Sequence, residues 1–259
     1  MKYKLRRKIL SQNFLYSLKL TKLLVDNSSI DQNDIVLEIG AGKGLITTEL
    51  CKKAQKVIAL ELDEKLFLHL KQFLGNNLNL NLHQIDFLKF PLPKFPYKVF
   101  ANIPFSIEGE IIRKLLDSNN PPEDCYLIVD KRLASRLSGL PHENQFSLKH
   151  KPWFNFSIFY QFKRSDFTPS PSIDSVMWQI NKKEVPLLPI EERSSWEKFI
   201  EIGFGQGTTV NKNLLKLLSK EQLQNLSAKI NFSLKTKSGY LSFPQWLKIY
   251  KALRTSEDV

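Results

Sequence analysis

The sequence predicts an α/β protein, with a Rossmann-like and mainly parallel sheet of about seven strands followed by a small C-terminal α-helical domain. Three observations support this fold class. Short apolar segments alternate with segments of helical periodicity as far as residue 183. A glycine-rich turn at residues 40–44 connects a strand-like segment to a helix-like one. From residue 184 onward the apolar residues follow the helical period alone.

The expected strands are short segments rich in β-branched and aromatic residues. They are residues 34–40, 56–60, 81–85, 98–101, 126–129, 154–162 and 176–180. Between them apolar residues recur at every third or fourth position, which predicts helices with one buried face. Ser17 is expected to cap an earlier helix.

The chain is expected to divide into two domains, residues 1–183 with a basic N-terminal arm and residues 184–259. A proline-containing linker begins the second domain, which we expect to bind RNA. Its predicted helices are residues 194–201, 211–218, 220–230 and 243–253.

The charge balance indicates a polyanionic partner. Lys and Arg total 38 against 26 Asp and Glu, a formal net charge of +12, which makes nucleic acid the first expectation. The basic segment 1–8 would then contact phosphates, or it is a solvated tail. Lys212, Lys216 and Lys220 are expected on one helix face, where the same two alternatives apply.

The composition disfavours several other classes of protein. No apolar run is long enough to cross a bilayer, and the N-terminus lacks the apolar segment of a signal peptide, so we expect no membrane association. Cys51 and Cys125 are isolated, which favours a reducing, cytoplasmic location. The four histidines lack metal-ligand spacing, so we expect no metal. We also expect a monomer.

The turn at residues 40–44 has the sequence context of a nucleotide-binding loop. Gly40 and Gly42 would permit a tight turn and let a ligand approach the backbone closely. The spacing is neither that of a phosphate loop nor the full dinucleotide pattern. Glu61 and Leu62 end the next strand, about 20 residues further on, where a carboxylate can bind a ribose diol. With the glycine turn in register, we favour ribose binding over a solvated strand end.

Two further strand ends carry candidate ligand-binding residues. Asp86 and Phe87 follow the third strand. The Asp86 carboxylate would accept a hydrogen bond from an adenine amine, with the Phe87 ring packed beside it. The alternative is that the two residues begin an ordinary loop. Asn102, Pro104 and Phe105 follow the fourth strand. An amide oxygen and a carbonyl held by the proline turn can accept from an exocyclic amine, and the ring can stack on a base. The alternative is an ordinary strand-to-helix turn.

These segments, in this order and spacing, resemble the ribosomal RNA adenine N6-dimethyltransferases. They are residues 11–15, 38–44, 61–63, 86, 102–105 and 167–175. Within that family, residues 99–104 and 126–137 resemble the Erm macrolide-resistance branch more than the KsgA housekeeping branch. Phe105 stands where tyrosine is commoner, which keeps stacking and removes a hydroxyl. Residues 204–209 lack the arginine and lysine cluster that many relatives carry there.

The resemblance implies a methyltransferase fold with S-adenosylmethionine as the cofactor. The substrate would be 23S rRNA, N6-methylated and dimethylated at one adenosine, which confers resistance to macrolide, lincosamide and streptogramin B antibiotics. Two alternatives stay open, a KsgA-like 16S rRNA dimethyltransferase and a non-catalytic nucleic-acid-binding relative.

The resemblance also assigns roles to residues. It places Asn13, Leu15 and the Gly40 turn beside the methionine part of the cofactor, Glu61 at the ribose and Asp86 at the adenine amine. Asn102 would contact both the methionine part and the target base, and the catalytic residues would be Asn102, Pro104 and Phe105.

Overall fold

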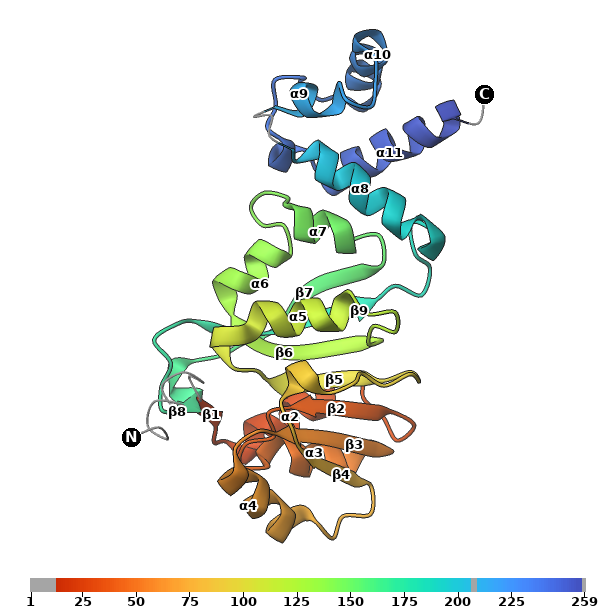
Figure 1. Ribbon diagram of the computed structural model, residues 1–259. Coiled ribbons are helices and arrows are strands. Elements are labelled where there is room, and N and C mark those ends of the chain that lie inside the picture. Colours follow the sequence, from red (N-terminus) through yellow and green to blue (C-terminus); the bar gives the residue numbers. More distant parts are fainter. Residues whose placement is uncertain (1–12, 206–208, 258–259) are drawn as a thin grey trace. The chain divides into compact units, whose positions relative to one another are not determined.

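The computed structural model describes residues 13–205 and 209–257 (Figure 1). The chain forms two compact units, Met1–Ala134 with Asn155–Lys182, and Ser135–Phe154 with Lys183–Val259. The division after Lys182 lies beside the boundary expected from the sequence. Ser135–Phe154, which was expected in the sheet-containing domain, groups with the helical unit instead. The basic segment 1–8 and the first two residues of the 11–15 motif lie outside the described residues.

The first unit is built on a seven-stranded sheet of order β4-β3-β2-β5-β6-β9-β7, and each expected strand is present (Figure 1). The strands are β2 (Ile35–Ile39), β3 (Lys56–Glu61), β4 (Leu80–Gln84), β5 (Lys98–Asn102), β6 (Asp124–Asp130), β7 (Phe154–Gln161) and β9 (Ser175–Lys182). The pairs from β4 to β6 are parallel, and β9 runs antiparallel to β6. The predicted α/β fold with a mainly parallel sheet is therefore confirmed.

A second, very small sheet was not expected. β1 (Phe14–Leu15) pairs antiparallel with β8 (Phe167–Thr168), and Phe14 lies opposite Thr168. Two-residue strands are too short to show a hydrophobic period, so no pattern in the sequence predicts them. This pairing joins the start of the described chain to the proline-rich loop that precedes β9.

Helices connect the strands as the periodicity predicted. They are α2 (Leu18–Asn27), α3 (Leu45–Lys53), α4 (Glu64–Leu74), α5 (Glu108–Leu116) and α6 (Lys131–Leu137), with one-turn 3-10 helices η1 (Phe87–Lys89) and η2 (Phe105–Ile107) after β4 and β5. Ser17 caps α2 as expected, since its Oγ accepts from the amide of Leu20 at 3.2 Å.

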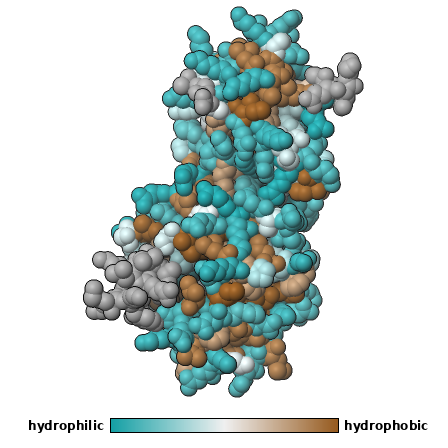
Figure 2. Space-filling model, viewed as in Figure 1, coloured by the Kyte–Doolittle hydropathy of each residue, from teal (hydrophilic) through white to brown (hydrophobic). Residues whose placement is uncertain are grey.

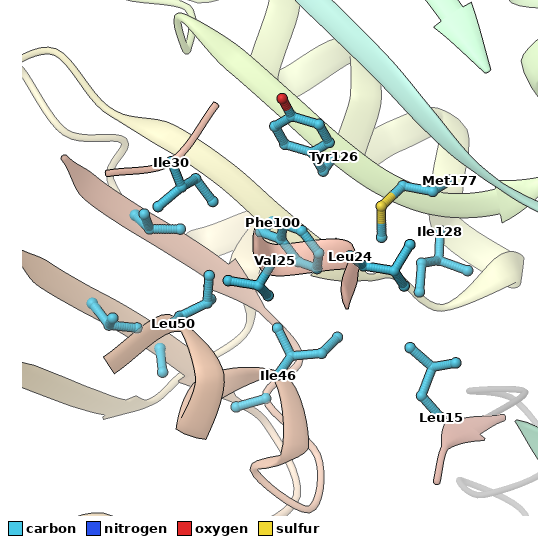
Figure 3. Packing of buried hydrophobic residues seen from close by; sticks show 14 of the residues in the cluster. Leu15, Leu24, Val25, Ile30, Ile46, Leu50, Phe100, Tyr126, Ile128 and Met177 are labelled. Atoms are coloured by element: carbon cyan, nitrogen blue, oxygen red, sulfur yellow. The ribbon is translucent and has the colours of Figure 1, made fainter. Parts of the chain in front are cut away.

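Both faces of the central strands are buried, as in most parallel sheets. One face packs against α2 and α3, where Leu24, Val25 and Ile46 surround Phe100 and approach Met177 of β9 (Figure 3). The alternate strand residues that point to the other face, among them Leu37, Ile58, Val99, Ala101 and Leu127, are also less than 9% exposed. The sheet edge that ends in polar residues is thereby held rigid from both sides.

The second unit is helical, as predicted. It contains α7 (Gln145–His150), α8 (Arg193–Gly203), α9 (Val210–Leu214), α10 (Lys220–Ile230) and α11 (Phe243–Glu257). Its core is aromatic: Trp196 meets Tyr250 edge-on at 5.1 Å between ring centroids, and Phe199 meets Trp246 at 5.5 Å.

The predicted lysine stripe is wrong. The helix expected over residues 211–218 ends at Leu214, and a new helix begins after Ser219, whose side chain forms a capping box with Gln222. Lys212 lies on α9, Lys216 in the turn and Lys220 at the start of α10, so the three do not share one helix face. The helix expected at residues 220–230 is therefore present, whereas the helix before it is shorter than expected.

On the face shown in Figure 2 hydrophilic residues predominate and apolar residues form separate small patches. None of the described helices is long and apolar enough to span a bilayer. Within residues 13–205 and 209–257 no three His, Cys, Asp or Glu side chains cluster in a way that could hold a metal ion.

Candidate functional site

A pocket of about 780 Å³, part of it open to solvent, lies at the carboxyl ends of β2, β3, β4 and β5. This is the edge at which open α/β sheets bind ligands. Every predicted site residue except Leu15 lines it: Asn13, Gly40, Gly42, Glu61, Leu62, Asp86, Phe87, Asn102, Pro104 and Phe105. Predicted residues up to 92 positions apart in the sequence are thus brought to one site, since Asn13 and Phe105 both belong to its wall.

Leu15 lies beside the pocket, in a smaller hollow that shares Gly40, Gly42 and Asn102 with it. Its side chain is 6% exposed, packs into the core of the first unit and lines a smaller neighbouring hollow together with Phe14 and Ala41. The leucine therefore supports the segment that carries Asn13 and is not part of the larger pocket's wall.

Sequence reasoning missed the apolar part of the wall. The additional lining residues are Phe14, Ile39, Leu60, Ile85, Ile103, Ile107 and Ile111. Most of them lie within a few positions of a predicted polar residue, but an apolar side chain there looks the same in sequence as any core residue. Only the three-dimensional arrangement distinguishes pocket wall from core.

The glycine turn has the backbone conformation that makes glycine necessary. Gly40 has φ of +77° and Gly42 has φ of +60°, both in the left-handed region that favours glycine. A Cβ at Gly42 would come within 2.9 Å of the Phe14 ring. The turn therefore exposes bare backbone to the pocket and leaves Phe14 room to cover it.

The Glu61 carboxylate is fixed at the pocket wall. Its Oε2 accepts from the amide of Gly42 at 2.8 Å and its Oε1 from the amide of Asp63 at 2.7 Å. Burial raises the pKa of this 4%-exposed carboxyl, and the two amide donors oppose that shift. Each oxygen keeps a further lone pair, so the carboxylate can still accept from a pair of hydroxyls.

Asp86 is held in a similar way at the end of β4. Its Oδ1 accepts from the amide of Leu88 at 2.9 Å, which caps η1. Oδ2 has no hydrogen-bond partner within the described part of the chain. The carboxylate thus has one oxygen committed to the turn and one available to a donor in the pocket, with Phe87 lying beside it in the same wall.

The amide of Asn102 has a defined orientation. Its Nδ2 donates to the backbone carbonyl of Asn13 at 2.7 Å, which leaves Oδ1 as the acceptor. Pro104 follows with φ of −62°, and its carbonyl accepts from the amide of Ile107 at 3.1 Å while retaining a second lone pair. Phe105 begins η2 and is half-buried in the pocket wall. The turn therefore offers two hydrogen-bond acceptors and a ring at one place.

Glu38, on β2 before the glycine turn, is a buried carboxyl that sequence reasoning did not single out. Its side chain is 1% exposed. Burial raises its pKa to about 8, the nearby Glu61 adds to the shift, and Thr47 opposes it. The folded protein therefore holds this proton at pH values where the unfolded chain has already lost it.

We expect this group to make the protein less stable as pH rises from about 4.5 to about 8, with no further change above. Because each pKa unit corresponds to about 1.4 kcal/mol, the loss is of the order of several kcal/mol. Glu38→Gln should melt like wild type at pH 5 and at a higher temperature than wild type at pH 9. The exposed Glu184→Gln is the control, and equal pH dependence in all three proteins would contradict the prediction.

Comparison with known proteins gives one family over nearly the whole chain. The family model described as ribosomal RNA adenine dimethylase matches residues 3–255. A ribosomal RNA small subunit methyltransferase A from Nostoc sp. is 30% identical, with 95% of this chain and 97% of the relative covered. An rRNA adenine N-6-methyltransferase from Bacillus anthracis is 28% identical, with 93% of this chain and 85% of the relative covered.

Solved structures show the same fold. The 23S rRNA methyltransferase ErmE matches with a TM-score of 0.85 at 24% identity, over 93% of this chain and 100% of that one. A dimethyladenosine transferase from Plasmodium falciparum matches with a TM-score of 0.72 at 23% identity, over 93% of this chain and 98% of that one. At these identities the likeness concerns the fold, including the helical C-terminal region.

Proposed function

The chain belongs to the ribosomal RNA adenine dimethylase family, and from that premise we propose that it N6-methylates, and dimethylates, an adenosine of 23S rRNA. It is an S-adenosylmethionine-dependent rRNA adenine methyltransferase; the choice of RNA is the proposal. Modification of that adenosine would confer resistance to macrolide, lincosamide and streptogramin B antibiotics, in the cytoplasm. The observation that carries the choice is the resemblance of residues 99–104 and 126–137 to the Erm branch.

The pocket fits this cofactor. Glu61 presents a fixed carboxylate for a ribose diol, and Asp86 presents a free oxygen for an adenine amine between apolar neighbours such as Leu62 and Phe87. The bare backbone of the glycine turn admits the methionine part, with Asn13 on the same wall. We therefore assign Asn13, the Gly40 turn, Glu61, Asp86 and Asn102 to cofactor binding.

The turn that contains Asn102, Pro104 and Phe105, called the catalytic turn below, would act mainly by positioning the reactants. The adenine N6 lone pair is delocalised into the ring and is a poor nucleophile, whereas the bound cofactor supplies a methyl group on a positively charged sulfur. Asn102 Oδ1 and the Pro104 carbonyl would accept the N6 hydrogens and direct the lone pair toward the methyl group. Phe105 would stack on the target base, which must leave its own stack to reach the pocket. Such positioning can lower the barrier by several kcal/mol.

The second candidate is methylation of the small subunit. The 30% identity to a small subunit methyltransferase A supports it, because that relative covers the chain nearly end to end. The two candidates share the pocket and the catalytic turn and differ only in the RNA that presents the adenosine.

The experiment is methyl transfer from labelled cofactor to two substrates, protein-free 23S rRNA and assembled 30S subunits, with the modified adenosines mapped by mass spectrometry. We expect N6-methyladenosine and N6-dimethyladenosine at one position of the 23S rRNA. Transfer to 30S subunits alone would overturn the proposal in favour of the second candidate. RNA binding without transfer to either would identify a non-catalytic relative.

A further inference from the structure

Lys114 of α5 ties down the turn that carries Asp86. Its Nζ donates to the carbonyls of Phe87 at 2.7 Å, Leu88 at 2.8 Å and Phe90 at 2.6 Å. An ammonium has three donors, so these three carbonyls use all of them. The same Nζ lies 4.9 Å from the centroid of the Phe87 ring, within range of a cation–π contact.

The turn needs such a partner because it is a single 3-10 turn. Asp86 caps its start, and the amides of Lys89 and Phe90 donate to the Asp86 carbonyl at 2.9 and 3.1 Å. The carbonyl of Phe87 accepts from the amide of Phe90 at 3.0 Å, but those of Leu88 and Phe90 have no following helical turn to accept from, as at the end of any helix. Lys114 supplies donors to all three carbonyls from a different element, 24 to 27 residues further along the chain.

Lys114 does not belong to the pocket wall, whereas Asp86 and Phe87 do. Its position in α5 is fixed, because Ile111, Ile112 and Leu115 of the same helix are fully buried. Burial lowers the pKa of the ammonium and the charge of Asp86 opposes that shift, so the cation has given up part of its hydration for these contacts. The lysine therefore acts on the pocket through the turn and not by contact with a ligand.

We propose that Lys114 is a positioning residue for the adenine end of the cofactor. By holding the turn against α5, Lys114 presets the Asp86 carboxylate and the Phe87 ring. The inference rests on the assignment of Asp86 to the adenine amine under the proposed function. Without the clamp, the turn would have to be ordered when the cofactor binds, and affinity would fall by that cost.

A matched control exists in the same unit. Lys53 of α3 clamps the end of α2 in the same way, with Nζ donating to the carbonyls of Val25 at 2.6 Å, Asp26 at 2.9 Å and Ser28 at 3.3 Å. Burial lowers its pKa as well. Lys53 and the three carbonyls that it binds lie outside the pocket wall, so its loss tests the general effect of removing a lysine clamp.

The experiment is calorimetric titration of the full-length variants with S-adenosylhomocysteine. We expect Lys114→Met to raise the dissociation constant about tenfold, and Lys53→Met to change it less than about twofold, although both lower the melting temperature. Lys114→Arg, which keeps several donors on a positive charge, should recover most of the affinity. If Lys114→Met and Lys53→Met bind alike, Lys114 is merely structural and the proposal fails.

The variant Asp86→Asn tests the positioning role of Lys114 separately from the assignment of Asp86 to the adenine amine. We expect Asp86→Asn to weaken binding, and Lys114→Met to add less than its full effect in the Asp86→Asn background, because both act through one turn. Full additivity of the two changes overturns the positioning role alone. An Asp86→Asn protein that binds like wild type overturns the adenine assignment, and the inference with it.

Discussion

Asn102→Ala is expected to lower the single-turnover rate of methyl transfer about 10²- to 10³-fold, the usual effect of removing one preorganised polar group at a reacting centre. The physical reason is the bond from Asn102 Nδ2 to the Asn13 carbonyl at 2.7 Å, which fixes Oδ1 as an acceptor for the target amine. The dissociation constant for S-adenosylhomocysteine should rise by less than about tenfold, because Glu61 and Asp86 remain in place. Rapid quench with labelled cofactor, beside calorimetry, measures both.

Asn120→Ala is the matched control for that change. Its Nδ2 also donates to backbone carbonyls, those of Pro93 and Phe95 at 2.9 Å each, but it lies outside the pocket wall. Asn102→Asp adds a second test, since it keeps an oxygen and replaces the donor to Asn13 with a second acceptor. Transfer by Asn102→Ala at the wild-type rate would remove Asn102 from the mechanism.

Phe105→Ala is expected to lower methyl transfer to rRNA about 5- to 150-fold, because stacking of one base on an aromatic ring contributes about 1–3 kcal/mol. Phe105→Tyr keeps the ring and should remain within about threefold of wild type. The measurement is the single-turnover rate at saturating cofactor, together with the affinity for S-adenosylhomocysteine.

Phe95→Ala is the control, because that ring is 42% exposed in a loop outside the pocket wall and should not affect transfer. Similar losses in Phe105→Ala and Phe105→Tyr would show that the position tolerates only phenylalanine for reasons of packing. That result would contradict a stacking role.

The sheet could be predicted because buried parallel strands are continuous apolar segments, and β2, β3, β5 and β6 each have that composition. Elements that depend on contacts between distant residues could not be predicted from the sequence. The β1–β8 pair has no hydrophobic period, and the grouping of Ser135–Phe154 with the helical unit depends on which partner those helices find. The apolar period of residues 211–218 did not show that α9 ends at Leu214.

The candidate site also has a part that could be predicted from the sequence and a part that could not. Glu61, Asp86 and Asn102 could be predicted, since polar residues directly after apolar strands gather at one edge of a parallel sheet. The contacts that orient these side chains could not be predicted. The acceptor for Asn102 is a backbone carbonyl 89 residues away, and the clamp on the Asp86 turn comes from Lys114. A backbone carbonyl has no signature in a sequence, and a lysine on a helix is usually solvated.

The short β1–β8 ladder links the two ends of the first unit's chain. Phe14 pairs with Thr168, and Asn13, directly before it, receives the hydrogen bond from Asn102. The position of the carbonyl that orients the Asn102 amide therefore depends on a pairing between the start of the described chain and the loop before β9. A polypeptide still emerging from the ribosome, with residues 167–168 not yet made, would lack that pairing, so the strand beside Asn13 would form only at a late stage of synthesis.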